Sequence, residues 1–180
     1  MDGHADFLLI GGLSRELEGD YSPDEPDAWS GTVFQWISEA QSARKGAVGK
    51  KLVRRWAERA GMNVTAKSSR DHDFCVDGLR VAVKLSLVWS HGGFVFEQIR
   101  DQRYDVVSLL ALEPAQVRLW VVPKYVLWEH AAWQHKGVAG RDTKWLRFPA
   151  IEPPAWLKPY GGQLSRAKAA LKQARRGDSS

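Results

Sequence analysis

The sequence contains a single cysteine, Cys75, among its 180 residues. One thiol can form no internal disulfide and cannot build a cysteine-based zinc centre. The five histidines are scattered along the chain and include no HExxH spacing. These absences disfavour zinc catalysis. We expect a cytoplasmic protein in which any metal is held by oxygen ligands.

Long apolar runs are also missing. The most apolar stretches, Phe7–Ile10 and Val106–Leu112, are far shorter than the roughly 18 residues that span a bilayer. Asp2 and Asp6 surround the start of the first stretch, where a secretory signal would carry basic residues. We therefore expect neither a secretory signal nor a membrane partner.

The chain has enough apolar residues for one globular domain, with 44% hydrophobic content and nine Trp. Its net charge of +5 is divided unevenly: residues 1–30 carry −7, and the remainder carries +12. This division predicts an acidic arm over 1–30, a main domain over 31–165 and a basic tail over 166–180. The basic body predicts a polyanionic partner, with nucleic acid as the first candidate.

Hydrophobic periodicity predicts an α/β domain with a mixed central sheet flanked by helices. Helices are expected over 32–42, 48–60, 123–130 and 164–175, and strands over 62–66, 93–99, 105–112, 117–122 and 145–148. Residues 134–143 are expected to form a loop, and the prolines of 149–159 an extended connection. In the second helix one face is apolar, through Val48, Leu52, Val53, Trp56 and Ala60. The opposite face is basic and includes Lys50 and Arg54.

Asp77-Gly78 lies between alternating residues and predicts a two-residue hairpin turn. This turn would pair Val76 with Leu79, Asp73 with Ala82, and Asp71 with Lys84. Strand alternation then gives one apolar face that must meet the core: Phe74, Val76, Leu79, Val81, Val83 and Leu85. The opposite face carries Asp73, Ala82 and Lys84.

The pattern on this second face is suited to phosphate chemistry. Carboxylates at both paired positions could hold Mg²⁺ against a phosphate, and a lysine two residues further on could orient water and stabilise developing charge. Asp73 and Lys84 fill two of the three places. The third place is Ala82, which has no ligand atom.

Several segments together resemble the PD-(D/E)xK nuclease superfamily, in the branch of type II restriction endonuclease-like proteins. They are Gly46-Ala-Val-Gly49, Arg70-Asp-His-Asp-Phe74, Arg80-Val-Ala-Val-Lys-Leu-Ser86 and Gln98-Ile-Arg-Asp-Gln-Arg-Tyr-Asp105. The resemblance covers roughly residues 42 to 150. It implies a restriction endonuclease-like fold and Mg²⁺- or Mn²⁺-dependent hydrolysis of phosphodiesters in double-stranded DNA.

The resemblance also assigns roles to particular residues. Asp73 matches the metal-binding aspartate and Lys84 the motif lysine, and the Val83 carbonyl would complete the metal site. Ala82 stands where the family has Glu, Asp or sometimes Gln, and Lys50 stands where many members have a helix glutamate. Asp73, Ala82 and Lys84 are thus the expected catalytic positions.

Three accounts of Ala82 remain open at this point. The chain is an engineered or trapped inactive enzyme, a natural DNA-binding descendant that does not cleave, or an active enzyme whose acid has moved. Glu97 is the first candidate for a moved acid, with Asp71 and Asp77 behind it. The alternative to an enzyme is a non-catalytic regulator or a reader of modified DNA.

The expected DNA contacts lie on the second helix and after strand 93–99. They are Lys50, Arg54, Gln98, Arg100, Gln102 and Arg103. Gln and Arg make bidentate contacts that distinguish adenine and guanine, and Lys and Arg bind phosphates. Trp89 is an aromatic candidate for a nucleic-acid contact. A palindromic duplex would favour a two-fold homodimer.

Overall fold

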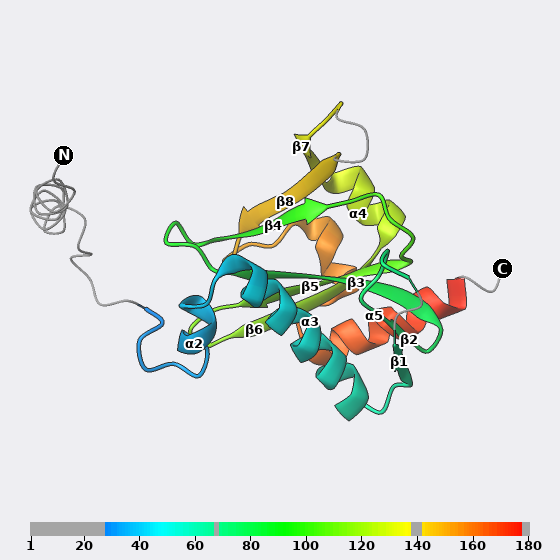
Figure 1. Ribbon diagram of the computed structural model, residues 1–180, viewed down its shortest axis with the longest axis horizontal. Coiled ribbons are helices and arrows are strands. Elements are labelled where there is room, and N and C mark those ends of the chain that lie inside the picture. The colour runs from blue at the N-terminus through cyan, green and yellow to red at the C-terminus, as the bar shows by residue number, and fades with distance from the viewer. Residues whose placement is uncertain (1–27, 67–68, 138–141, 178–180) are drawn as a thin grey trace, which may run out of the picture.

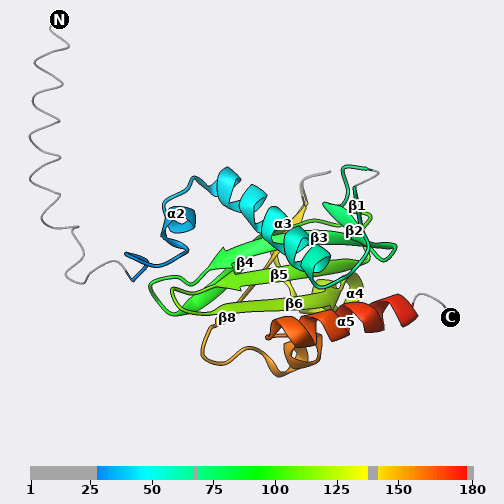
Figure 2. The same ribbon diagram turned by 90° about the horizontal axis from the view of Figure 1, so that it is seen from below.

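The protein is described by a computed structural model over residues 28–66, 69–137 and 142–177. Residues 1–27 of the predicted acidic arm lie outside this described part. Figures 1 and 2 show two sheets with helices packed around them. Within the described residues, no helix combines the length and apolar character needed to cross a membrane.

The central sheet has five strands in the order β1-β2-β3-β5-β6. Its strands are β1 (Val64–Ala66), β2 (Phe74–Val76), β3 (Leu79–Leu87), β5 (Val106–Leu112) and β6 (Val117–Pro123). β3 and β5 are parallel, and the other neighbours are antiparallel. The predicted α/β class with a mixed central sheet is confirmed, and β5 is buried along its whole length, as its apolar run predicts.

A second, antiparallel sheet covers one face of the central sheet (Figure 1). It consists of β4 (Gly93–Ile99), β8 (Thr143–Pro149) and β7 (Ala132–His135), and its neighbours are α4 (Lys124–His130) and the 3₁₀ helix η1 (Ala155–Tyr160). Aromatic rings fill the layer between the sheets, where Trp120 meets Phe148 edge to face at 5.6 Å. This second layer covers the sheet face that carries Ala82.

Helices cover the opposite face. α3 (Ser42–Arg59) packs near β3 and α5 (Leu164–Gly177) near β6, as Figure 2 shows from below. Val53 and Ala57 of α3 and Leu171 of α5 are buried in this core. Residues 166–177, expected to be a basic tail, therefore continue a helix that packs against the domain.

The predicted hairpin forms with the expected turn and register. Val76 pairs with Leu79, and Asp77 and Gly78 both have positive φ, as this turn requires. The ladder ends at the pair of Phe74 and Val81, so the predicted strand pairings of Asp73 with Ala82 and of Asp71 with Lys84 are both wrong. Asp73 meets β3 instead through its amide, which donates to the Val81 carbonyl at 2.8 Å. The chain bends before β2, where the Asp71 amide donates to Ser69 Oγ at 3.1 Å.

Other differences from the sequence prediction arise where tertiary packing overrides local pattern. The helix expected over 32–42 is only α2 (Gln35–Ser38), followed by the separate helix α3. The loop expected over 134–143 begins within β7, which pairs with β8. The connection expected to be extended contains η1, and Leu52 is exposed although it was expected on the buried face of α3.

Gly49 brings α3 unusually close to β3. A Cβ atom at this position would lie 2.8 Å from Leu85 Cβ, closer than real carbon atoms pack. At Gly46, one turn earlier in the same helix, an added Cβ atom would have no atom of another described element within 4 Å. The close approach therefore depends on Gly49 and places the next residue, Lys50, beside the sheet.

The two glycines give a matched test of this contact. Both alanine substitutions gain about 0.5–1 kcal/mol of helix propensity. We expect Gly46→Ala to raise the free energy of unfolding by that amount. The free energy of unfolding of Gly49→Ala should lie about 1–3 kcal/mol below that of Gly46→Ala, because its methyl group overpacks against Leu85. Denaturant unfolding measures both values, and equal stability of the two variants would contradict the close approach.

Candidate functional site

Asp73 is held at the start of β2 by contacts with two other elements. Its Oδ2 accepts a hydrogen bond from the Val83 amide of β3 at 2.8 Å. Its Oδ1 forms an ion pair with Lys50 Nζ of α3 at 2.7 Å. The structure thus brings together Asp73, Val83 and Lys50, three residues singled out in the sequence, and Val83 meets Asp73 through its amide.

Lys84 lies beside this pair on β3, and its ammonium donates a hydrogen bond to the Gln98 carbonyl of β4. Burial is the main reason why the pKa of Lys84 falls from its ordinary value of 10.5 to about 8. The nearby Asp73 carboxylate opposes this fall, and the charges of Lys50 and Arg100 add to it. We therefore expect Lys84 to exchange its proton near pH 8.

Gln98 reaches Lys84 through its backbone because β4 bulges at this point. The register with β8 shifts between Phe96 and Ile99, and Gln98 has a positive φ of 55°. The Gln98 amide donates to Gln134 Oε1 of β7 at 3.0 Å. Sequence reasoning missed Gln134, because its contact is distant in sequence and its segment was expected to be a loop.

A cavity of about 280 Å³, here called the site pocket, opens around these residues. Its walls include Lys50, Asp73, Lys84, Arg70, Asp71 and Arg100. Ala82 also lines the site pocket, with 9% of its surface exposed. A longer side chain at position 82 would therefore enter the same space as the Asp73 carboxylate.

The three candidates for a moved acid occupy different places. Asp71 lines the site pocket with Asp73. Glu97 instead lines a neighbouring groove, and Asp77 lies in the hairpin turn, where its carboxylate accepts the Asn63 amide at 3.0 Å. Asp71 is thus the one candidate of the three in the site pocket, whereas Glu97 was the first choice from sequence.

The predicted DNA contacts divide in a similar way. Lys50, Gln98, Arg100 and Gln102 all line the site pocket. Arg54 lies one turn further along α3 and pairs with Glu58 at 3.0 Å. Arg103 is exposed and lies outside the site pocket.

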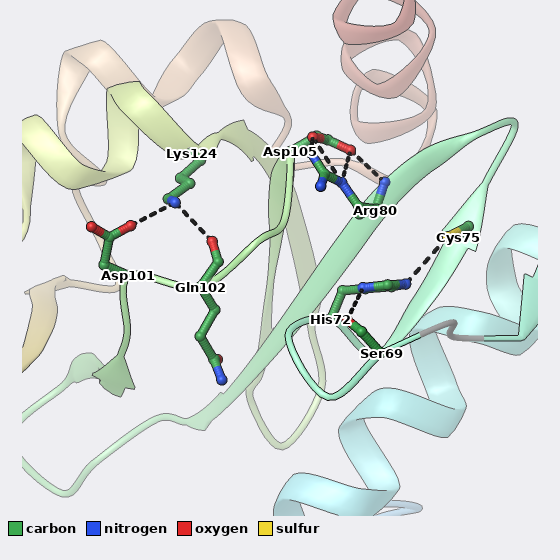
Figure 3. A network of polar contacts seen from close by, with 8 residues as sticks. All are labelled: Ser69, His72, Cys75, Arg80, Asp101, Gln102, Asp105 and Lys124. Carbon is green, nitrogen blue, oxygen red and sulfur yellow. Dashed lines mark hydrogen bonds and ion pairs between the residues drawn. The ribbon is translucent and has the colours of Figure 1, made fainter. Parts of the chain in front are cut away.

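The loop between β4 and β5, which carries Arg100 and Gln102, is held in place by half-buried and exposed polar contacts (Figure 3). Lys124 Nζ pairs with Asp101 Oδ1 at 2.6 Å and donates to the Gln102 carbonyl at 2.7 Å. The Gln102 side chain points away from Lys124 (Figure 3). At the end of the loop, Arg80 forms an ion pair and hydrogen bonds with Asp105.

His72 is buried in the wall of the site pocket, where its ring contacts Ser69 Oγ and Cys75 Sγ at 3.4 Å each (Figure 3). Both ring nitrogens therefore have partners within the protein. His72 and Cys75 fix the bend before β2 and leave the chemistry of the site pocket to Asp73 and the surrounding bases.

A larger groove of about 740 Å³, here called the outer groove, continues from the site pocket between α3 and β3. The two share Lys50, Val83, Lys84 and Gln98. Trp89 lines the outer groove with 56% of its surface exposed. The position of Trp89 suits an aromatic contact with a ligand that extends out of the site pocket.

The two motif positions, Asp73 and Ala82, do not supply the pair of carboxylates that a magnesium site of this kind needs. Within the described ranges, no three His, Cys, Asp or Glu side chains cluster as metal ligands. Asp73 supplies one carboxylate, Ala82 supplies no ligand, and Lys50 places a positive charge against Asp73. The chemistry of this donor set favours an anion over a divalent cation.

Comparison with known proteins supports the fold. No family model and no curated protein matches the chain. A solved structure, that of the bacterial homing endonuclease I-Ssp6803I, is similar with a TM-score of 0.54 and 17% sequence identity. The similarity covers 78% of this chain and 99% of that chain. The chain therefore has a fold similar to that of an endonuclease. The PD-(D/E)xK superfamily stays a prediction from the motif residues.

The protonation of Lys84 can be followed by NMR titration, with the signal assigned by its loss in Lys84→Arg. We expect a midpoint near pH 8 in the wild type. Asp73→Asn should lower this midpoint, because the carboxylate favours the ammonium, and Lys50→Met should raise it, because a like charge is removed. A wild-type midpoint near 10.5, or shifts in the same direction in both variants, would contradict this geometry.

Proposed function

We propose that the protein binds double-stranded DNA through the site pocket and the outer groove, and that it derives from a restriction-type endonuclease of the PD-(D/E)xK kind. The observation that carries this proposal is the meeting of Asp73 and Lys84 in one basic pocket on an endonuclease-like fold. The resemblance to the PD-(D/E)xK family implies that these two residue types serve metal-dependent hydrolysis of a phosphodiester.

The charge around the site supports a nucleic acid as the ligand. Lys50 and Arg100 face the site pocket from α3 and from the loop after β4. Lysine and arginine bind backbone phosphates, and such contacts supply much of the affinity of proteins for DNA. Gln98 and Gln102 add amide groups that can contact base edges or sugars.

The same site argues against cleavage by this chain. Ala82 leaves the second metal-ligand position without an acid, and Lys50 neutralises the one that remains. In a cleaving version, Mg²⁺ or Mn²⁺ would be held by Asp73 and an acid at position 82. We therefore propose a protein that binds DNA without cutting it, as a regulator or a reader of modified DNA would.

A second candidate function is an active nuclease that uses Asp71 in place of the missing acid. It is favoured by one observation, the presence of Asp71 in the site pocket. Cleavage by the wild type that is lost in Asp71→Asn and in Lys84→Met would establish this candidate.

Restoring the acid tests the proposal directly. We expect the wild type to leave supercoiled and linear DNA intact, and Ala82→Glu combined with Lys50→Gln to gain cleavage in Mg²⁺ or Mn²⁺. The new carboxylate supplies the missing ligand, and the second change frees Asp73 from its ammonium partner. Gel assays should use DNA from several sources, both modified and unmodified.

Two controls complete this test. Adding Lys84→Met to the double variant should abolish the gained cleavage, and the cleavage assay should be run at DNA concentrations that saturate each variant, so that weaker binding is not counted as lost chemistry. A double variant that binds duplex DNA but cuts none of the substrates would count heavily against the loss of an ancestral cleavage site. If the wild type cuts and Lys84→Met leaves its rate unchanged, the assignment of the site is wrong.

A further inference from the structure

The Asp73 carboxylate has protein donors on both of its oxygens. Lys50 Nζ lies 2.7 Å from Oδ1, and the Val83 amide lies 2.8 Å from Oδ2. The Asp73 side chain is only 16% exposed, whereas Lys50 is 50% exposed. A divalent ion bound to Oδ1 would therefore lie against the ammonium of Lys50, whose like charge opposes its binding.

The packing of α3 holds Lys50 at this position. Gly49 lies directly against Leu85 of β3, so the backbone of the helix approaches the sheet one residue before Lys50. The ion pair then joins α3 to the start of β2. A backbone contact thus places the Lys50 Cα atom within reach of the Asp73 carboxylate, with which the ammonium pairs.

The remaining charge of the site pocket is positive. Four basic side chains and two carboxylates line it. Lys50 is paired with Asp73, while Lys84 and Arg100 also face the cavity. Such a balance attracts an anion and repels a free divalent cation.

We propose that the site pocket binds a DNA backbone phosphate directly, with the ammonium of Lys50 in the place where a nuclease would hold its metal ion. This inference rests on the proposed function and deepens it. It names the ligand of the site pocket, and it states that DNA binding there needs no metal ion. The phosphate contacts Lys50 and Lys84, and the strand continues into the outer groove, which shares both residues.

Fluorescence anisotropy with a labelled duplex tests this inference, with EDTA in one series and Mg²⁺ or Ca²⁺ in the other at matched ionic strength. We expect the dissociation constants in the two series to agree within about twofold, because phosphate contacts by lysine release counterions without needing a divalent ion. Calorimetric titration of Mn²⁺ into the protein alone should show no site that depends on Asp73.

Lys50→Met and Lys51→Met form a matched pair of variants. Lys50 lines the site pocket, whereas Lys51 is an exposed lysine on the next position of α3 outside that lining. We expect Lys50→Met to weaken duplex binding about five- to tenfold near 0.1 M salt and to reduce the salt slope by about one. Lys51→Met should change the affinity by less than about twofold.

The results that would contradict this inference differ from those that would contradict the proposed function. Duplex binding that requires Mg²⁺ or Ca²⁺, or Mn²⁺ binding that Asp73→Asn removes, would overturn the inference and leave the proposed function standing. Equal effects of Lys50→Met and Lys51→Met would overturn the phosphate contact in the site pocket. A wild type that binds no duplex in either series would overturn the proposed function itself.

Discussion

The close packing of α3 on β3 at Gly49 is the constraint on which the site depends. Because Gly49 has no side chain, the helix approaches Leu85 and presents Lys50 to the Asp73 carboxylate. The second sheet covers the other face of the central sheet and carries Gln98, whose carbonyl accepts a hydrogen bond from Lys84. The site pocket is thus formed where a helix, the central sheet and the second sheet meet.

The charged side chains of the site pocket decide which ligand it can bind. Asp73 and Lys84 are the residue types of a metal-dependent nuclease, but Ala82 removes one ligand and Lys50 adds a cation to the other. The result is a site that keeps the contacts needed for a phosphate and lacks those needed for a catalytic metal ion. In the proposed function, loss of cleavage and retention of DNA binding are two consequences of the same two residues.

Sequence patterns predicted those parts of the structure that depend on residues close together in the chain. The Asp77-Gly78 turn set the register of β2 and β3, and apolar alternation identified the buried face of β3. The same patterns could not show that Lys50 would meet Asp73 or that Gln134 would hold the bulge at Gln98, because both contacts join distant segments. They also overextended the hairpin to Asp71, where a side-chain contact with Ser69 bends the chain.

The most direct measurement of the central claim is a crystal structure with duplex DNA grown in the presence of Mn²⁺, whose anomalous scattering locates any bound ion. The account predicts a backbone phosphate within hydrogen-bonding distance of Lys50 and Lys84, with Lys50 still paired to Asp73 and no anomalous peak on that carboxylate. A Mn²⁺ ion on Asp73 with Lys50 displaced, or DNA bound to a surface away from the site pocket, would contradict it.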